Sequence, residues 1–433
     1  MIVPLRIRVQ SILGTFLSGE ALKLSLKTRS TWYLFGLSTI YLGLNYLWAS
    51  YNSLVLPSQV AVIAPATEED VVLGIIASVG VMLGLFFNLV SGVLSDRVTL
   101  FWGRRRPFIV LGTGATILLL IAEIKLPLSV IFVALEYTFM EIFTNLSQGS
   151  FRPLLPDLVK KEQRGKAAGF LGLFTMIGTA LGYGITGYEL GSGHFTDSLE
   201  LSAALLLLTT LPTLFVIRRD DPPVKGSVSF RQALAGIVRI REEAPKFFWF
   251  VGGTFLVYMG SSGLIYFEPY YFKAVLGLEN PAYGVALTGI VVLISGILSA
   301  VAFGILSDFV GRKMMLVSAA LAGGTFMLLL PFVRSMPEFL VIAALLGTVI
   351  GIFVSVRNAM ASDLVPAEAS GKFMGYANLS VGGPSVLAPL FDGVILSVFS
   401  GFMGGFGVLF FISGGFYFLG ALLLFRVKCK GNC

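Results

Sequence analysis

The stretch SDRVTLFWGRRR at residues 95–106 decides the fold, because it recurs as SDFVGRKMM at residues 307–315. Both stretches follow a long apolar segment and carry an aspartate, then a glycine, then basic residues. The two aspartates, Asp96 and Asp308, lie 212 residues apart. In a chain of 433 residues, this spacing indicates two related halves.

A second pair of stretches supports the duplication. DLVKKEQRGKAAG at residues 157–169 is echoed by DLVPAEASGKFMG at residues 363–375. Their leading residues, Asp157 and Asp363, lie 206 residues apart. Two echoes at nearly one offset predict halves that are related by an axis along a membrane normal.

The composition is that of a chain embedded in lipid. Apolar residues make up 56% of the chain and charged residues 13%, whereas soluble domains carry roughly 25% charged residues. The 50 glycines and 37 phenylalanines suit helices that pack closely in a bilayer. The composition therefore argues against a soluble multidomain enzyme. The net charge of +7 lies in loops, so we expect a lipid bilayer and not nucleic acid as the partner.

Twelve apolar stretches are long enough to cross a bilayer, which takes roughly 20 helical residues. They predict spans at residues 32–55, 71–94, 108–122, 128–149, 167–188, 199–217, 247–271, 283–306, 314–332, 339–355, 373–394 and 402–425. We therefore predict an all-α membrane protein with two six-helix bundles, at residues 31–217 and 247–425. The polar interval at residues 218–246 is the predicted linker between them.

The basic residues predict the orientation in the membrane. With both termini in the cytoplasm, 28 of the 31 lysines and arginines lie on the cytoplasmic side, as the positive-inside rule requires. Residues 1–30 are expected to lie on the membrane surface, and part of the linker to form an interfacial helix. Cys429 and Cys433 lie in the tail at residues 426–433; a reduced tail is favoured over a metal or lipid site. We expect a monomer in the cell membrane.

The loop between the second and third spans resembles the GxxxDRxGRR signature of the major facilitator superfamily. The matching residues are Gly92, Asp96, Arg97, Gly103, Arg104 and Arg105. An aspartate at a helix end can bond a nearby arginine and a facing helix end, which would form a cytoplasmic latch. The predicted gate also includes the charged residues of the other loops, Arg152, Asp157, Asp308, Arg312 and Asp363. The alternative is that these arginines only set the topology.

Further stretches are similar to a narrower family. The SDR…GRRRPFI segment, EIFTNLSQGSFRPLLPDLV at residues 141–159 and GTALGYG at residues 178–184 resemble the plant sucrose transporters and their animal relatives. That branch is close to the glycoside and pentoside cation symporters. The resemblance covers most of residues 90–187 and departs at Phe101, where the family has an arginine. It implies the major facilitator fold, proton coupling, a sugar substrate and no cofactor, with a disaccharide favoured.

Span 4 carries the candidate proton site. Glu141, Asn145, Gln148 and Arg152 follow one another at steps of four, three and four residues, so they lie on one helix face. The residue count places Glu141 near the membrane midplane, where a carboxylate must be paired, hydrated or protonated. The resembling family has an aspartate with a coupling role at this position. We therefore predict that Glu141 binds the transported proton; a buried structural hydrogen bond is the alternative.

Polar side chains of three spans are expected to line one substrate cavity. Amides bond pairs of sugar hydroxyls, and an aromatic ring covers the apolar face of a pyranose. Span 1 offers Asn45, Trp48 and Asn52 at helical spacing, although ordinary helix packing explains this pattern as well. The full set of expected cavity residues is Asn45, Trp48, Asn52, Asn145, Gln148, Tyr258, Ser262 and Glu268.

The remaining acidic residues of the spans are weaker candidates. Glu136 lies nearer the outer side than Glu141, and Glu123, Glu189 and Asp392 lie near outer span ends, where we expect water to solvate them. The sequence contains no nucleophile elbow, metal-ligand cluster or phosphate loop, so we predict neither an enzyme nor a metal site. The predicted function is proton-coupled uptake of a sugar or glycoside by alternating access. The alternatives are an exporter or uncoupled facilitator of another solute and, further away, a membrane sensor.

Overall fold

The computed structural model describes residues 28–97, 103–217, 245–364 and 370–427. Helices joined by short turns make up these residues. The predicted surface segment before residue 28, most of the linker, and the tail cysteines Cys429 and Cys433 lie outside the described residues. The predictions for them stay predictions.

The helices of the two halves follow the predicted spans. The first half contains α2 (Thr31–Ser38), α3 (Ile40–Ser50), η1 (Tyr51–Val55), α4 (Leu56–Ile63), α5 (Glu69–Arg97), α6 (Arg106–Lys125), α7 (Val130–Phe151), α8 (Leu154–Leu158), η2 (Lys161–Gln163), α9 (Arg164–Gly191) and α10 (Phe195–Val216). The second half contains α13 (Pro245–Met259), α14 (Leu264–Ala274), α15 (Pro281–Val310), α16 (Arg312–Leu329), η3 (Leu330–Phe332), α17 (Met336–Leu364), α18 (Ser370–Val398), η5 (Met403–Gly405) and α19 (Phe406–Phe425).

The first predicted span is the most irregular. Eleven helical stretches among the described residues are long and apolar enough to cross a membrane. The twelfth span runs from Thr31 to Ile63 as four successive pieces, each too short to count alone. One piece, η1, is a π-helix, which bulges the backbone and is common at functional sites. Pro57 follows at the start of α4, where a missing backbone N–H is tolerated.

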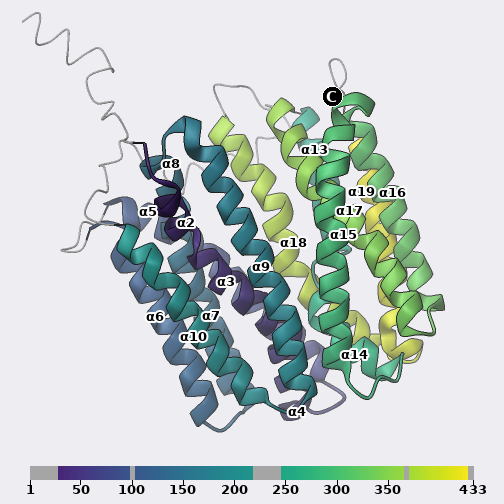
Figure 1. Cartoon of the computed structure of the whole chain (residues 1–433). Coiled ribbons are helices and arrows are strands. Elements are labelled where there is room, and N and C mark those ends of the chain that lie inside the picture. Colours follow the sequence, from purple (N-terminus) through teal and green to yellow (C-terminus); the bar gives the residue numbers. More distant parts are fainter. Residues whose placement is uncertain (1–27, 98–102, 218–244, 365–369, 428–433) are drawn as a thin grey trace, which may run out of the picture.

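The two halves use the same helix pairs. In the first half α5 packs along α7 and α3 along α9; in the second half α15 packs along α17 and α13 along α18. Figure 1 shows the purple-to-teal helices of the first half beside the green-to-yellow helices of the second. The predicted all-α fold with two pseudo-symmetric bundles is therefore confirmed.

The repeated loop motif corresponds to a repeated turn. Gly103 has a φ of 108° and Gly311 a φ of 98°, which are left-handed values that glycine adopts without a steric penalty. Gly311 ends α15 and directly precedes α16, so the chain reverses within one residue. This requirement explains why a glycine precedes the arginines in both sequence echoes.

The bundles touch each other at one end of the molecule. We call the end that holds the start of α2, the end of α5 and the end of α19 the basic end, and the opposite end the far end (Figure 1). Near the far end α5 crosses α18 so closely that a Cβ added at Gly74 would lie 2.5 Å from the backbone oxygen of Pro389. Ser78 accepts a hydrogen bond of 2.9 Å from the backbone N–H of Leu390 at the same crossing.

The second crossing, between α9 and α15, is also close at the far end. A Cβ added at Gly187 would collide with Ala286. Toward the basic end of α9, by contrast, no described atom lies within 4 Å of a Cβ added at Gly165, Gly169 or Gly172. The bundles are thus held together at the far end by small residues, and α9 has open space beside it at the basic end.

Replacing Gly74 with leucine is expected to hold the far end open, because the new side chain has no room beside the Pro389 backbone. The basic end should then close more often. The measurement is thiol labelling of Gly172→Cys in a Cys429→Ser, Cys433→Ser background, where Gly74→Leu should slow labelling severalfold. Gly114→Leu is the matched control, since no described atom lies within 4 Å of that Cβ. Equal labelling with and without Gly74→Leu would contradict the prediction.

Candidate functional site

Glu141 lies halfway along α7 and is 4% exposed. Its Oε2 accepts a hydrogen bond of 2.9 Å from Asn145 Nδ2, and its Oε1 accepts one of 3.3 Å from the Tyr137 hydroxyl. Among the described side chains, no lysine or arginine forms an ion pair with it. The carboxyl is therefore solvated by two neutral donors, an environment in which a permanent charge is costly.

Glycines of α5 make room for this carboxyl. A Cβ added at Gly84 would lie 2.8 Å from Glu141 Oε2 and 2.7 Å from Asn145 Nδ2. A Cβ added at Gly80 would collide with the Tyr137 ring. Small residues let the two helices approach closely, as in other membrane proteins. This packing sets Glu141 at a sealed helix contact and away from lipid.

A chain of hydrogen bonds leads from Glu141 toward the basic end. Asn88 of α5 donates to Asn145 Oδ1 at 3.0 Å and to Gln148 Oε1 at 3.3 Å. The exposed Arg152 donates to the same Gln148 oxygen at 2.9 Å. The four residues of the predicted stripe thus lie in one network. Asn88 was missed in the sequence, although an amide within an apolar span was a usable signal.

A second set of hydrogen bonds connects Glu141 to the other bundle. The Tyr137 hydroxyl lies 3.1 Å from Asn52 Oδ1 of η1, 3.3 Å from Glu141 Oε1 and 3.3 Å from the Tyr266 hydroxyl of α14. Tyr266 belongs to the second half of the chain, so one hydroxyl joins three elements and both bundles. Sequence reasoning missed both tyrosines; only the spacing of Tyr137, four residues before Glu141, pointed to it.

The predicted stripe of span 1 divides between two neighbours. Asn45 Nδ2 donates to the Tyr41 backbone oxygen at 2.7 Å and lies 3.5 Å from Thr175 Oγ1 of α9. Asn52 instead faces Tyr137. Trp48, between them, is half-buried. The structure therefore brings Asn52 to the Glu141 network and places Asn45 beside α9.

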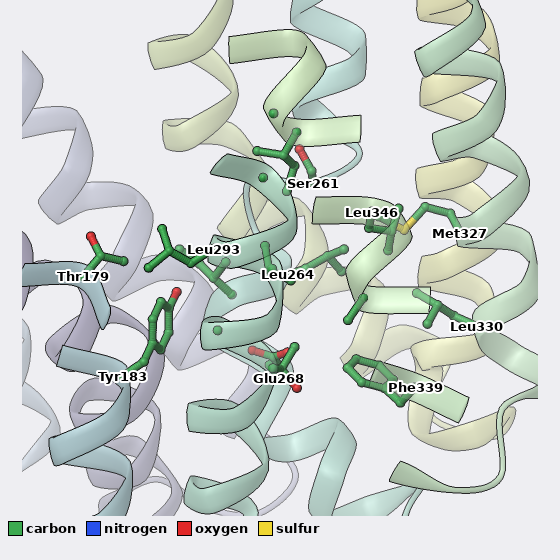
Figure 2. Close-up of a pocket in the computed structure, with 18 of the residues that line it drawn as sticks. Thr179, Tyr183, Ser261, Leu264, Glu268, Leu293, Met327, Leu330, Phe339 and Leu346 are labelled. Atoms are coloured by element: carbon green, nitrogen blue, oxygen red, sulfur yellow. The ribbon is translucent and has the colours of Figure 1, made fainter. Parts of the chain in front are cut away.

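An apolar cavity of about 390 Å³ lies between α9 and the second bundle. Its lining residues come from α9, α14, α15, α16, η3, α17, α19 and the turn before α14, and Glu268 is the one charged residue among them. Figure 2 shows Glu268 between Tyr183 and Thr179 on one side and Phe339 and Leu330 on the other. Such a cavity suits a largely apolar ligand with a single basic group.

The other expected cavity residues of the second half lie beside this cavity. Ser261 lines it, whereas its neighbour Ser262 and Tyr258 do not. Tyr258 packs edge-to-face on Phe353, with ring centroids 6.3 Å apart. Of the predicted substrate residues, Glu268 alone is among those that line this cavity.

The predicted gate residues form ion pairs within each bundle. Arg105 Nη1 lies 2.6 Å from Asp157 Oδ2, and Arg104 Nη2 lies 3.6 Å from the same oxygen. In the second half Arg312 pairs with Asp308 at 2.9 Å and also with Asp363. The Asp157 and Asp363 pairs are equivalent under the repeat. Each of them ties the loop after the second helix of its bundle to the end of the fourth.

The remaining part of the gate motif is only partly described. A Cβ added at Gly92 would lie 3.7 Å from the Gly149 backbone oxygen, which is an ordinary van der Waals distance. The side chains of Asp96 and Arg97 lie outside the described part of the chain, so the latch at Asp96 stays a prediction.

The expectation that water solvates the outer acids was wrong for two residues. Glu123 is 4% exposed, because Tyr51 and Gln59 cover it and bond its carboxyl. Asp392 is 2% exposed and lies against Gly263, at the break between α13 and α14. The positions of these acids in the sequence could not show that residues distant in sequence would bury them. Glu189 is half-buried.

The comparison with known families agrees with this architecture. The family model described as Major Facilitator Superfamily matches residues 33–304 and 250–430. This chain belongs to the Major Facilitator Superfamily. It is therefore a multi-pass membrane transporter and not an enzyme.

Several curated members of the Major Facilitator Superfamily are similar to parts of the chain. Multidrug resistance protein MdtG of Proteus mirabilis is 32% identical over 40% of this chain and 41% of its own length. The general alpha-glucoside permease of Schizosaccharomyces pombe is 27% identical over 50% of this chain and 43% of its own length. Sucrose transport protein SUC4 of Arabidopsis thaliana is 29% identical over 36% and 33%. The chain thus spans less than half the length of these relatives.

Solved structures of the superfamily share the fold. The nucleoside transporter NupG superposes with a TM-score of 0.73 at 13% identity, over 92% of this chain and 100% of that chain. A bacterial homolog of the human lysosomal transporter Spinster superposes with a TM-score of 0.68 at 15% identity, over 94% and 100%. Identities this low bear on the fold alone.

Asp157→Asn is expected to destabilise this superfamily member more than Asp308→Asn. Arg105 is 1% exposed and would lose a charged partner, which costs about 2 kcal/mol. Asp308 is 60% exposed, and a pair of that kind contributes less than about 1 kcal/mol. The melting temperatures of the two purified variants test this order. A Tm for Asp157→Asn equal to or above that for Asp308→Asn would show that the Arg105 contact does not stabilise the bundle.

Proposed function

We propose that this transporter couples the uptake of a sugar or glycoside to protons by alternating access, with Glu141 as the site of the transported proton. The observation that carries the proposal is the Tyr137 hydroxyl, which connects Glu141 to Tyr266 of the opposite bundle. A residue that binds the proton must act on the contact between bundles, because that contact decides which side is open. A single residue, Tyr137, connects Glu141 to this contact between the bundles through its hydroxyl.

The coupling follows from the single proton of the Tyr137 hydroxyl. When Glu141 is ionised, Tyr137 donates to it, and the Tyr266 hydroxyl can donate to the Tyr137 oxygen. When Glu141 is protonated, it donates to the Tyr137 oxygen instead, and Tyr137 turns its own proton to Asn52 or Tyr266. Protonation of Glu141 therefore reverses the hydrogen bond that joins the two bundles at Tyr137. The change matters energetically because a buried hydrogen bond left unmade costs roughly 1–3 kcal/mol.

The two ends of the molecule differ in how closely the bundles contact each other. The far end is closed by the glycine contacts, while the chain of Asn145, Asn88, Gln148 and Arg152 leads from Glu141 to the basic end. With the predicted orientation, the basic end faces the cytoplasm. This arrangement fits the stage in which the proton leaves Glu141 toward the cytoplasm.

The sugar assignment has two supports. The Glu141 network is rich in amides, which pair with hydroxyl groups, and two of the relatives named above are an alpha-glucoside permease and a sucrose transport protein. We place the sugar beside this network, with Trp48 as the apolar platform. The proposed transporter acts as a monomer in the cell membrane.

Glu141→Gln is expected to abolish proton-driven accumulation while leaving substrate exchange partly intact, because glutamine keeps hydrogen bonds and carries no proton. Labelled sugar uptake into proteoliposomes with an imposed pH gradient is the measurement. Glu68→Gln, at an exposed far-end position, is the control and should accumulate normally. Full accumulation by Glu141→Gln would show that Glu141 does not bind the transported proton. Uptake that persists without a pH gradient but requires sodium would identify sodium as the coupling ion.

A second candidate function is transport of lipophilic organic cations. The specific observation in its favour is the apolar cavity around Glu268, which lacks the amides that a sugar needs. A relative described as a multidrug resistance protein is consistent with it. In this case the carboxylate would pair with the cation, and the apolar walls would bind its rings.

Three variants distinguish the substrates. Trp48→Ala and Asn45→Ala should each weaken sugar binding about tenfold, since one lost buried contact is worth roughly 1–3 kcal/mol. Glu268→Gln should leave sugar binding unchanged. Calorimetry with a sugar panel and with tetraphenylphosphonium provides both readouts. Binding of tetraphenylphosphonium that Glu268→Gln abolishes, together with no sugar binding by the wild type, would replace the sugar proposal with the second candidate.

A further inference from the structure

A second group of buried carboxyls lies in the first bundle, nearer the far end than Glu141. Glu123 of α6 and Glu136 of α7 are 4% and 3% exposed, and both contact the Tyr51 hydroxyl of η1. Tyr51 is 1% exposed, as is Gln59 of α4, which bonds Glu123 Oε1. Four elements thus meet around two acids whose carboxyls share one hydroxyl.

No positive charge balances these acids within the described residues. The ion pairs of the described side chains all involve other acids, and no histidine contacts the group. The groups that face the two carboxyls are Tyr51 from η1, Gln59 from α4, and each other across α6 and α7. Two unbalanced charges side by side within a membrane span would cost many kcal/mol.

The hydrogen bonds leave the group short of one proton. Tyr51 has a single hydroxyl proton, yet its oxygen lies 2.6 Å from Glu136 Oε2, 3.2 Å from Glu123 Oε2 and 3.4 Å from Gln59 Oε1. Glu136 Oε1 is buried and has no hydrogen-bond partner, so an ionised Glu136 would be poorly solvated. Glu123 is better placed for a charge, because Gln59 already donates to its Oε1.

We propose that Glu123 and Glu136 hold one proton between them and form a second proton-binding site, separate from Glu141. The proton resides on Glu136 Oε2, which donates to the Tyr51 oxygen; Tyr51 donates its own proton to Glu123 Oε2. Glu123 then accepts from both Tyr51 and Gln59, and the unpartnered Glu136 Oε1 is a neutral carbonyl oxygen. One added proton completes the two shorter contacts of the Tyr51 hydroxyl, those to Glu136 and Glu123, and halves the charge of the group.

The site has a route to water on the far side. Gln59 also lines a cavity of about 750 Å³ that is bounded by far-end residues, among them Lys273, Glu279 and Asn280. On the inner side, the Tyr51 ring stacks on the Tyr137 ring, with centroids 5.8 Å apart and planes 19° apart. The site therefore lies between far-end water and the Tyr137–Glu141 network. Its role as a loading site for transport rests on the proton coupling proposed above, whereas its proton occupancy does not.

Either a proton or a sodium ion can bind at an oxygen-rich site, and the hydrogen-bond donors around the carboxyls determine which of them binds. Gln59 presents its N–H to Glu123, and Tyr51 lies at the distance of a strong O–H···O bond from Glu136. Sodium would need oxygen lone pairs, and not these donors, turned toward one point. The contacts favour a proton.

Infrared spectroscopy of the purified full chain in liposomes tests the assignment, because a protonated carboxyl has a C=O band that a carboxylate lacks. At neutral pH the wild type should show a protonated-carboxyl band that Glu141→Gln and the exposed control Glu68→Gln retain. Glu123→Gln/Glu136→Gln should lose one component of this band, so the difference spectrum between the wild type and the double variant should contain a protonated-carboxyl C=O band. A difference spectrum without that band, or a component that sodium alone abolishes in the wild type, would overturn the proposal.

A milder variant keeps the test valid if the double variant does not fold. Tyr51→Phe retains both carboxyls but removes the hydroxyl between them, so the band should shift in frequency while the protein elutes as the wild type does. An unshifted band would again overturn the proposal. Because the spectra need no substrate, the second site stands or falls separately from the result for Glu141→Gln in transport.

Discussion

Everything in this structure depends on the cost of placing a carboxyl group where no bulk water can reach it. The glycines of α5 meet this constraint at Glu141, because they let α5 and α7 approach closely enough to surround the carboxyl with Asn145 and Tyr137. A larger side chain at Gly84 would occupy the space of the carboxylate itself. Glu141 and the small residues opposite it, Gly84 and Gly80, form one packing unit, although they lie 57 and 61 residues apart.

The two bundles contain the same helix pairs but differ in how their buried acids are bonded. The first bundle holds three buried glutamates, Glu123, Glu136 and Glu141, and hydrogen-bonds each of them. In the second bundle, Glu268 and Asp392 accept no hydrogen bond from any described residue, and Glu268 borders an apolar cavity. The duplicated scaffold therefore surrounds buried acids with hydrogen-bond partners in one half and with apolar surface in the other.

The sequence predicted the parts of the molecule that depend on local pattern. Twelve spans, the repeat and the one-sided stripe from Glu141 to Arg152 follow from hydropathy and helical spacing, and all appear in the structure. The tertiary partners could not be predicted. Asn88 and Tyr266 meet the Glu141 network only after helices distant in sequence pack together, and Glu123 is buried because η1 and α4 fold over it.

The far-end contacts also bear on how fast the molecule can turn over. Where α5 crosses α18 and α9 crosses α15, glycine and alanine place backbone against backbone, and few large side chains interdigitate. Separating such surfaces breaks many weak dispersion contacts, including those of the Tyr183 ring of α9 with Gly289 of α15. The free-energy cost of opening this side is therefore spread over many small contacts along the crossing. Bulkier residues at these glycines would have no room beside the facing backbone, so they would shorten the lifetime of the closed state and leave this side open for longer.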